Sequence, residues 1–169
     1  MNITETKRLN ICELSIKDSA FILELLNEPA FIENIGDRNV KNLEDAENYI
    51  LNGPIASYHK HRFGLWAVIL KNTNELIGIC GLIKRDSLED IDIGFAFLER
   101  FWGNGYAVES AEACFDFARD VVEIKRLVAI TIPSNKGSIR VLENIGLKFE
   151  KMIIQPNDEN ELMLFGAEI

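Results

Sequence analysis

Apolar residues recur along the chain at two spacings, one typical of strands and the other of helices. Short apolar runs bounded by turn-forming or charged residues predict strands. These runs lie at residues 7–14, 63–70, 76–83, 91–97, 126–132, 147–154 and 161–165. Apolar residues three and four positions apart predict helices between them. The helices are expected from Asp18 to Pro29, from Asn42 to a stop at Asn52-Gly53-Pro54, from Ala107 to Ala118, and from a cap at Ser134 or Asn135 to Gly146.

The lengths of the connections predict how the strands pair. Most neighbouring strands are joined by short turns and are therefore expected to run antiparallel. Strands 91–97 and 126–132 are the exception, because a helix lies between them and returns the chain in the same direction. The pattern predicts a mixed α/β (α+β) fold with a central, mostly antiparallel sheet of six or seven strands, flanked by helices. With no repeat, linker or low-complexity stretch, residues 1–169 are expected to form a single domain.

Composition narrows the classes of partner. The 169 residues include 27 acidic and 18 basic side chains, for a formal net charge of −9. An acidic chain without a long basic run is a poor ligand for a phosphate backbone, which argues against bulk nucleic acid. No secretory signal or membrane-spanning run is present. We therefore expect a cytoplasmic protein without a membrane partner.

Cysteine and histidine give little support to a metal site. Cys12, Cys80 and Cys114 are far apart and lie in apolar segments, so they are expected to be buried free thiols, as suits a reducing compartment. His59 and His61 are two positions apart, which aligns them poorly on either a strand or a helix. No metal is therefore expected.

The loop before the long helix is the best candidate for an anion site. It follows strand 91–97 and places Gly103 and Gly105 where the helix begins. A helix start offers free N–H groups and partial positive charge, and glycine lets the backbone approach a phosphate closely. The alternative is a glycine turn that only starts the helix. A dinucleotide fingerprint is not supported, because its third glycine would fall at Val108, and no Gly-Lys-Ser/Thr P-loop occurs.

Two segments resemble the GNAT superfamily of acyl-CoA-dependent N-acyltransferases. Arg100-x-x-Gly103-x-Gly105 is similar to its pyrophosphate loop, and the segment from Asn135 to Gly146 is similar to its second cofactor segment. The phrase at residues 92–109 looks most like the RimJ/RimL-like branch, which contains ribosomal-protein N-terminal acetyltransferases. The resemblance covers nearly the whole chain. It implies a GNAT-like fold in which the parallel strand pair splays apart.

The resemblance also implies acetyl-CoA as acyl donor and a set of residues that hold it. These residues are Ile93, Phe95, Arg100, Gly103, Asn104, Gly105, Tyr106, Ala107, Asn135, Ser138 and Arg140. Loop N–H groups would hold the pyrophosphate, strand 91–97 would bond the pantetheine arm, and Asn135 would lie beside that arm. Arg100 could instead pair with an acidic neighbour. Arg140, with Lys136, either meets the phosphates or is an ordinary solvated charge.

Acetyl transfer needs a neutral amine and a proton for the leaving thiolate. Asp92 lies where the resembling branch commonly carries a carboxylate, so it is expected to be the base or to anchor a water relay; the alternative is a solvent-facing strand carboxylate. The tyrosine acid of many family members is replaced by Leu142. Ser138 is then the nearest hydroxyl that could bond the sulfur, although a serine there is often a local cap.

The acceptor is the least determined part. The helices before Phe63 and the polar segment at residues 58–62 are expected to wall its pocket. A weak base such as Asp92 favours a protein or peptide N-terminal α-amine, which is partly neutral near pH 8. A small amine, such as a polyamine or aminoglycoside, is the alternative acceptor. A CoA-binding sensor without turnover is the alternative from another class, and an edge strand leaves a homodimer possible.

Overall fold

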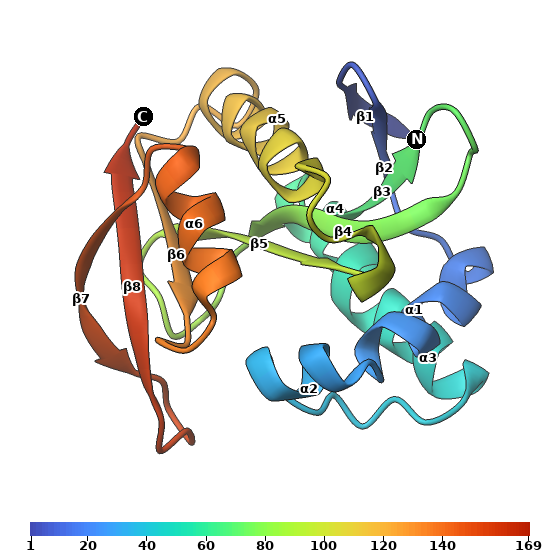
Figure 1. Cartoon of the computed structure of the whole chain (residues 1–169), viewed down its shortest axis with the longest axis horizontal. Helices are drawn as coiled ribbons and strands as arrows, with labels where there is room; N and C mark the ends of the chain where they lie inside the picture. Colours follow the sequence, from blue (N-terminus) through green and yellow to red (C-terminus); the bar gives the residue numbers. More distant parts are fainter.

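One open sheet of eight strands runs through the computed structural model, which describes residues 1–169 (Figure 1). The strands are β1 (Asn2–Glu5), β2 (Leu9–Cys12), β3 (Leu65–Leu70), β4 (Leu76–Ile83), β5 (Ile91–Phe97), β6 (Arg126–Thr131), β7 (Lys148–Ile154) and β8 (Glu161–Glu168). Their order in the sheet is β1-β2-β3-β4-β5-β6-β8-β7. The mixed α/β architecture predicted from the sequence is confirmed.

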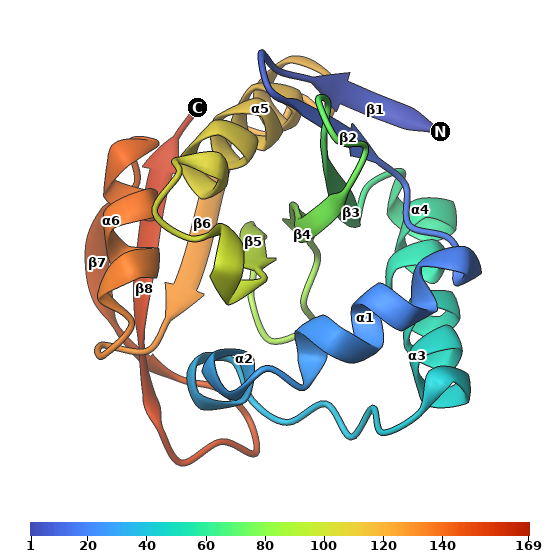
Figure 2. The same cartoon turned by 45° about the vertical axis from the view of Figure 1, so that its right-hand side comes forward.

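Six α-helices accompany the sheet. They are α1 (Ser19–Leu26), α2 (Pro29–Asn34), α3 (Leu43–Ile50), α4 (Ala56–His61), α5 (Tyr106–Asp120) and α6 (Lys136–Asn144). In two views α1, α2 and α3 gather below the β3 to β5 part of the sheet, whereas α5 and α6 lie above and beside it (Figures 1 and 2). None of the helices combines the length and the apolar character that crossing a bilayer requires.

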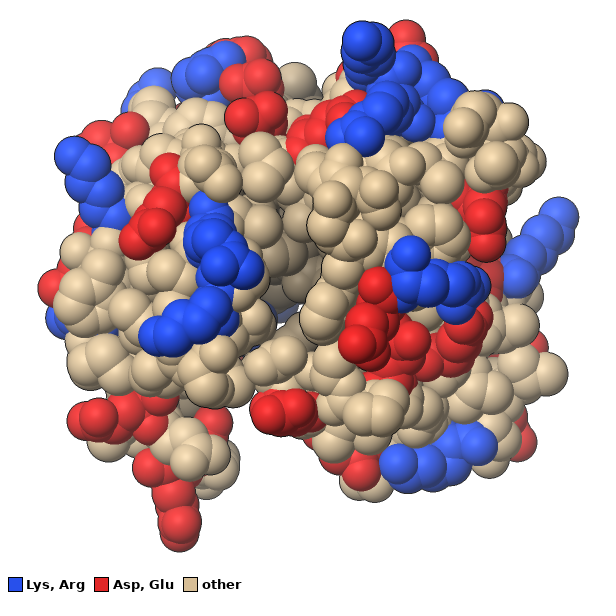
Figure 3. All heavy atoms as spheres, viewed as in Figure 1, with Lys and Arg blue, Asp and Glu red and all other residues tan.

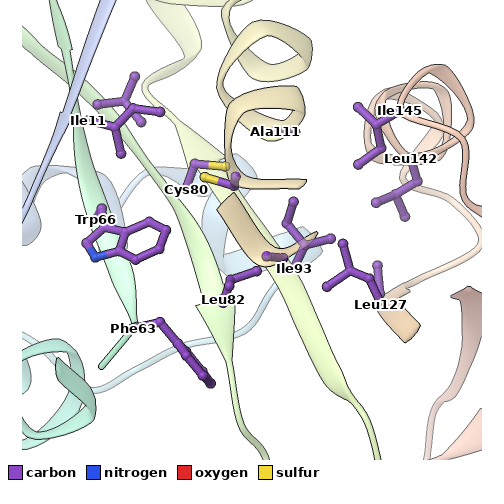
Figure 4. Close-up of a cluster of buried hydrophobic side chains, with 14 of the residues drawn as sticks. Ile11, Phe63, Trp66, Cys80, Leu82, Ile93, Ala111, Leu127, Leu142 and Ile145 are labelled. Carbon is purple, nitrogen blue, oxygen red and sulfur yellow. The ribbon is translucent and has the colours of Figure 1, made fainter. Parts of the chain in front are cut away.

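The helices bury two apolar clusters against the sheet. Trp66 and Cys80 belong to the larger cluster, under α5, whereas Ala67 belongs to the smaller one, with α1 and α3. Neighbouring strand residues point to opposite faces, so β3 can serve both clusters at once. In the larger cluster Leu142 of α6 points toward Leu127 of β6 (Figure 4). Helices α5 and α6 are therefore both packed firmly against the sheet.

The first predicted strand is wrong in its bounds. Residues 7–14 do not form one strand; the chain makes a hairpin of β1 and β2, so the sheet has eight strands instead of six or seven. Thr6 closes the turn, because its N–H donates to Leu9 O at 2.8 Å and its Oγ1 accepts from Leu9 N at 3.0 Å. The polar, partly exposed β1 lies at the sheet edge and carries no apolar alternation that would reveal it.

The predicted helix stop at Asn52-Gly53-Pro54 is also wrong. A π-helical turn at Leu51–Ile55 contains Pro54 and leads directly into α4. A wider turn tolerates proline because the missing N–H falls where the regular bonding pattern is already interrupted. The segment at residues 58–62 is consequently helical at its start and ends at Arg62, whose φ is 67°.

The parallel pair is confirmed and is very short. β5 and β6 pair only at Ile91 with Leu127 and at Asp92 with Val128. Beyond these positions β5 remains paired with β4, and β6 remains paired with β8. The facing edges of β5 and β6 therefore separate and leave their backbone groups without a strand partner.

Candidate active site

A cleft of about 1240 Å³ opens where β5 and β6 separate. Its walls include residues 92–97 of β5 and 129–131 of β6, the loop before α5, the start of α6, and α2. Figure 3 shows it as a hollow in the middle of this face of the molecule. Small-ligand pockets span about 300–1000 Å³, so this cleft is large enough for a ligand beyond the upper end of that range.

The loop before α5 points free N–H groups at one end of this cleft. Gly103 and Gly105 have φ of 79° and 81°, a conformation that side chains other than glycine rarely adopt. None of the backbone N–H groups of residues 103–108 donates a hydrogen bond within the protein. A Cβ built on Gly103 would meet nothing within 4 Å, so the space beside the loop is open. Consecutive free N–H groups at a helix start are a binding site for phosphate oxygens.

Hydrogen bonds fix the shape of this loop. The indole Nε1 of Trp102 donates to Phe97 O at 2.9 Å, which ties the loop to the end of β5. The Asn104 Nδ2 donates to Phe101 O at 3.1 Å and to Trp102 O at 3.2 Å. Asn104 therefore shapes the turn with its side chain and does not line the cleft.

Arg100 points away from the cleft. Its Nη1 lies 2.5 Å from Glu24 Oε1, and its guanidinium stacks on the ring of Phe101. This is the acidic pairing that the sequence left open as the alternative. The two cations expected from α6, Lys136 and Arg140, line the cleft and make no ion pair within the protein. Figure 3 shows basic side chains over α6 beside the hollow.

The start of α6 forms a second wall. Asn135 caps this helix, with its Oδ1 accepting from Ser138 N at 3.1 Å. Of the two predicted caps, Asn135 is therefore the correct one. The Ser138 hydroxyl lines the cleft and makes no hydrogen bond within the protein. Leu142 is 1% exposed and packs in the core, so the position at which the resemblance implies a tyrosine acid holds no proton donor.

Asp92 lies on the cleft wall at the point where β5 and β6 separate. It is 1% exposed, so the alternative of a solvent-facing carboxylate is wrong. Arg85 Nε donates to its two carboxylate oxygens at 3.1 and 3.2 Å. Burial raises the pKa of Asp92 to about 6, with the charge of Arg85 opposing the rise. A carboxylate with this pKa is ionised near pH 7 and can accept a proton.

Sequence reasoning missed Arg85 and Tyr49, and both line the cleft. Arg85 could have been found from the hairpin register, because Ile83 pairs with Asp92 and the following turn brings Arg85 back over it. Tyr49 of α3 carries no such signal, because it sits on an ordinary amphipathic helix. Burial raises the pKa of the Tyr49 hydroxyl, which makes no hydrogen bond within the protein. It therefore presents a protonated O–H to the cleft.

The predicted acceptor wall is largely wrong: α1 and residues 58–62 do not line the cleft, and α3 reaches it only through Tyr49. Helix α2, which the sequence did not predict because Pro29 was expected to end the helical pattern, forms that wall instead. Tyr58 is buried in the larger core cluster, where its hydroxyl accepts from Leu14 N at 3.1 Å and donates to Leu65 O. These bonds hold α4 against β3. Cys12 is also more exposed than expected, because it is only half-buried, whereas Cys80 and Cys114 are buried free thiols.

The donor set fits a CoA-like group. Free N–H groups and the unpaired cations Lys136 and Arg140 of α6 suit phosphate oxygens, and the unpartnered edges of β5 and β6 suit an amide-containing arm lying between them. No group of three or more His, Cys, Asp or Glu side chains is placed to hold a metal ion. The chemistry that the site offers is phosphate binding at one end and proton acceptance at Asp92.

Comparisons with known proteins show what the whole chain resembles. The uncharacterized protein YkkB of Bacillus subtilis (strain 168) is 40% identical over 91 residues, which span 53% of this chain and 53% of YkkB, about half of each. The crystal structure of a GNAT-family acetyltransferase from Bacillus anthracis has a TM-score of 0.82 at 25% identity and covers 99% of this chain and 98% of its own.

A second solved structure shares the fold at lower identity. RimL, the ribosomal L7/L12 alpha-N-protein acetyltransferase in complex with coenzyme A, has a TM-score of 0.85 at 15% identity and covers 100% of this chain and 98% of its own. The family model of the acetyltransferase (GNAT) domain matches residues 8–148. The protein therefore belongs to the GNAT acetyltransferase family.

Proposed function

We propose that this protein transfers the acetyl group of acetyl-CoA to the N-terminal α-amine of a protein or peptide. One observation carries the proposal: a single cleft has free loop N–H groups at one end and the buried carboxylate of Asp92 at the point where β5 and β6 separate. These two features suit the phosphates of the donor and the amine of the acceptor respectively.

The donor is held mainly by backbone groups in this proposal. The N–H groups of Gly103, Gly105 and the first turn of α5 bond the pyrophosphate, and Arg140 adds charge from α6. Backbone groups of Ile93 and Phe95 bond the pantetheine arm, because their β6-facing side has no strand partner. Acetyl-CoA supplies the activated acetyl group as a thioester.

Asp92 accepts the proton of the attacking amine, directly or through a water. Its pKa of about 6 makes it a weak base. An α-amine, with a pKa near 8, is already partly neutral at physiological pH, whereas a lysine or polyamine amine near 10.4 is almost fully protonated. A weak base therefore suits an α-amine better. Arg85 holds the carboxylate in place through its two hydrogen bonds.

The leaving thiolate needs little assistance, because thiol pKa values lie near 8.5. With Leu142 buried at the tyrosine position, the proposed hydrogen-bond donor to the sulfur is Ser138, whose hydroxyl is free. We assign Ser138 a modest contribution to the rate.

Two observations support a protein acceptor with a basic N-terminal region. RimL, which shares the fold, acts on the α-amine of a ribosomal protein. Glu28, Glu33 and Asp158 line the cleft and place negative charge on it, in keeping with the net charge of −9. Negative charge favours the approach of cationic acceptors.

The test measures CoA release with acetyl-CoA and a panel of acceptors. The panel contains basic peptides with a free N-terminus, the same peptides with an acetylated N-terminus as matched controls, polyamines and aminoglycosides. We expect release only with free α-amines. Release with polyamines or aminoglycosides but not peptides would replace the acceptor with a small amine. Tight binding of acetyl-CoA without release on any acceptor would instead support a sensor.

A further inference from the structure

Arg8 lies against the outer side of the loop before α5, although about one hundred residues separate them in the sequence. It comes from the turn between β1 and β2 and does not line the cleft. Its Nη1 donates to Asn104 O at 2.9 Å. Its Cζ lies 4.5 Å from the centroid of the Tyr106 ring. Arg8 therefore contacts the loop from outside the cleft.

Glu109 holds Arg8 in this position. Glu109 Oε2 accepts from Arg8 Nε at 2.7 Å, and Oε1 accepts from Arg8 N at 3.0 Å and from Thr6 Oγ1 at 2.5 Å. Burial opposes ionisation, but these hydrogen bonds together lower the pKa of Glu109. Glu109 is thus a carboxylate at neutral pH, and it fixes both the backbone and the guanidinium of Arg8.

We propose that Arg8 is a positioning residue that orients the phosphate-binding loop. In a planar trans peptide the C=O and the N–H point in opposite directions. Arg8 draws the Asn104 carbonyl outward, so the Gly105 N–H of the same peptide points to the other side, toward the cleft. Without this bond the peptide can rotate, since glycine at position 105 permits it, and turn a carbonyl oxygen toward the phosphate.

Charge strengthens the same effect. Glu109 lies in the first turn of α5, whose N-terminal end faces the proposed pyrophosphate. An unpaired carboxylate there would repel an anion and oppose the favourable end of the helix dipole. Arg8 neutralises that carboxylate at 2.7 Å. Loss of Arg8 therefore removes one orienting hydrogen bond and exposes one repulsive charge.

A purely structural role predicts a different outcome. If the contact between Arg8 and Glu109 only anchors the β1–β2 hairpin, its loss lowers stability and affects all ligands of the cleft alike. If Arg8 orients the loop, its loss weakens the binding of ligands that carry phosphates and leaves the binding of other ligands unchanged. The comparison therefore needs one probe with the phosphates and one without them: CoA, and pantetheine, which lacks the 3′-phosphoadenosine diphosphate part of CoA and with it the pyrophosphate.

The experiment measures dissociation constants of both probes for the wild type and three variants. Arg8→Met keeps the side-chain length and the contact with Tyr106 but donates no hydrogen bond. Arg8→Lys keeps the charge but lacks the fork that reaches both Glu109 and Asn104. Arg119→Met is the matched control, because Arg119 is an exposed arginine that pairs with Asp116 and Asp120 at the other end of α5.

We expect Arg8→Met to raise the dissociation constant of CoA about tenfold, Arg8→Lys about threefold, and Arg119→Met not at all. The dissociation constant of pantetheine should stay within about twofold in every variant. Equal weakening of both probes, or unchanged CoA binding in Arg8→Met, would overturn the inference. If Arg8→Met does not fold, Arg8→Lys carries the same comparison.

This inference rests on the proposed function, because it takes the loop to be the pyrophosphate site. The two fail in different ways. A wild-type protein that binds no CoA contradicts the proposed function itself. A wild type that binds CoA, together with an Arg8→Met variant that binds it equally well, contradicts only the role of Arg8.

Discussion

Replacing Asp92 by asparagine converts a buried carboxylate into a neutral amide of nearly the same shape. The pKa of Asp92 is about 6 in the folded protein, above its ordinary value of 3.8, because burial disfavours the charged form. The folded protein therefore holds this proton more tightly than the unfolded chain does. The resulting stabilisation is fully present below the unfolded pKa and is lost as the pH rises through about 6. Asparagine cannot lose a proton, so its contribution to the unfolding free energy does not change with pH.

The size of the effect follows from this pKa shift. Between about pH 5 and about pH 8 the wild type should lose about 1.4 kcal/mol of unfolding free energy relative to Asp92→Asn. Loss of the Arg85 pairing adds an offset that does not vary over this range, so only the slope with pH is diagnostic. A raised pKa is unusual for an aspartate in an ion pair. It arises here because desolvation of the carboxylate outweighs the attraction of Arg85.

Chemical denaturation of both proteins at a series of pH values measures this difference. All other titrating groups are shared, so they cancel in the comparison. Asp86→Asn, which removes an exposed carboxylate from the same connection, is the control for loss of charge alone. A difference between wild type and Asp92→Asn that stays constant with pH, or that moves in favour of the wild type as the pH rises, would refute the reasoning.

Three further predictions concern ligand binding and turnover. Gly103→Val should abolish CoA binding in titration calorimetry, because a branched side chain at a φ of 79° is strained and fills the open space beside the loop; unchanged affinity would remove the loop from the site. Arg100→Gln should change CoA affinity less than about twofold, because its guanidinium pairs with Glu24 outside the cleft; a larger loss would place Arg100 on the phosphates. The logarithm of kcat/KM for a peptide acceptor should rise with slope one between about pH 6 and pH 8 and with slope two below about pH 6, as the amine and Asp92 lose protons in turn. Asp92→Asn should lose the steeper limb and turn over more slowly; a wild-type profile would exclude Asp92 as base.

Local patterns sufficed where a segment's own residues determine its structure. Strand β5 was predicted to the residue, and Asn135 was one of two candidate caps for α6, because an apolar run with clear borders and a capping side chain are local signals. The parallel pairing of β5 and β6 followed from the crossover helix alone. The position of the loop before α5 followed from that pairing.

Long-range contacts were the part that the sequence could not supply. Asp92 is buried and bonded to Arg85 from the turn that follows β4, whereas strand alternation alone left its exposure open. The contact of Arg8 with Glu109 joins residues 101 positions apart, and neither residue stands out from other surface charges. Pro54 predicts the end of a helix by its local effect, but in the folded chain it lies inside the π turn at Leu51–Ile55, which local patterns do not reveal.

The short junction between β5 and β6 also affects how the molecule is held together. The sheet consists of two blocks, β1 to β5 and β6 to β8, and two residue pairs alone join them through the main chain. A ligand that lies in the gap and bonds both edges acts as a missing strand between the blocks. Cosubstrate at a hundred times its dissociation constant would raise the unfolding free energy by about 2.7 kcal/mol. Filling the cleft would thereby complete the sheet as well as supply the acyl group.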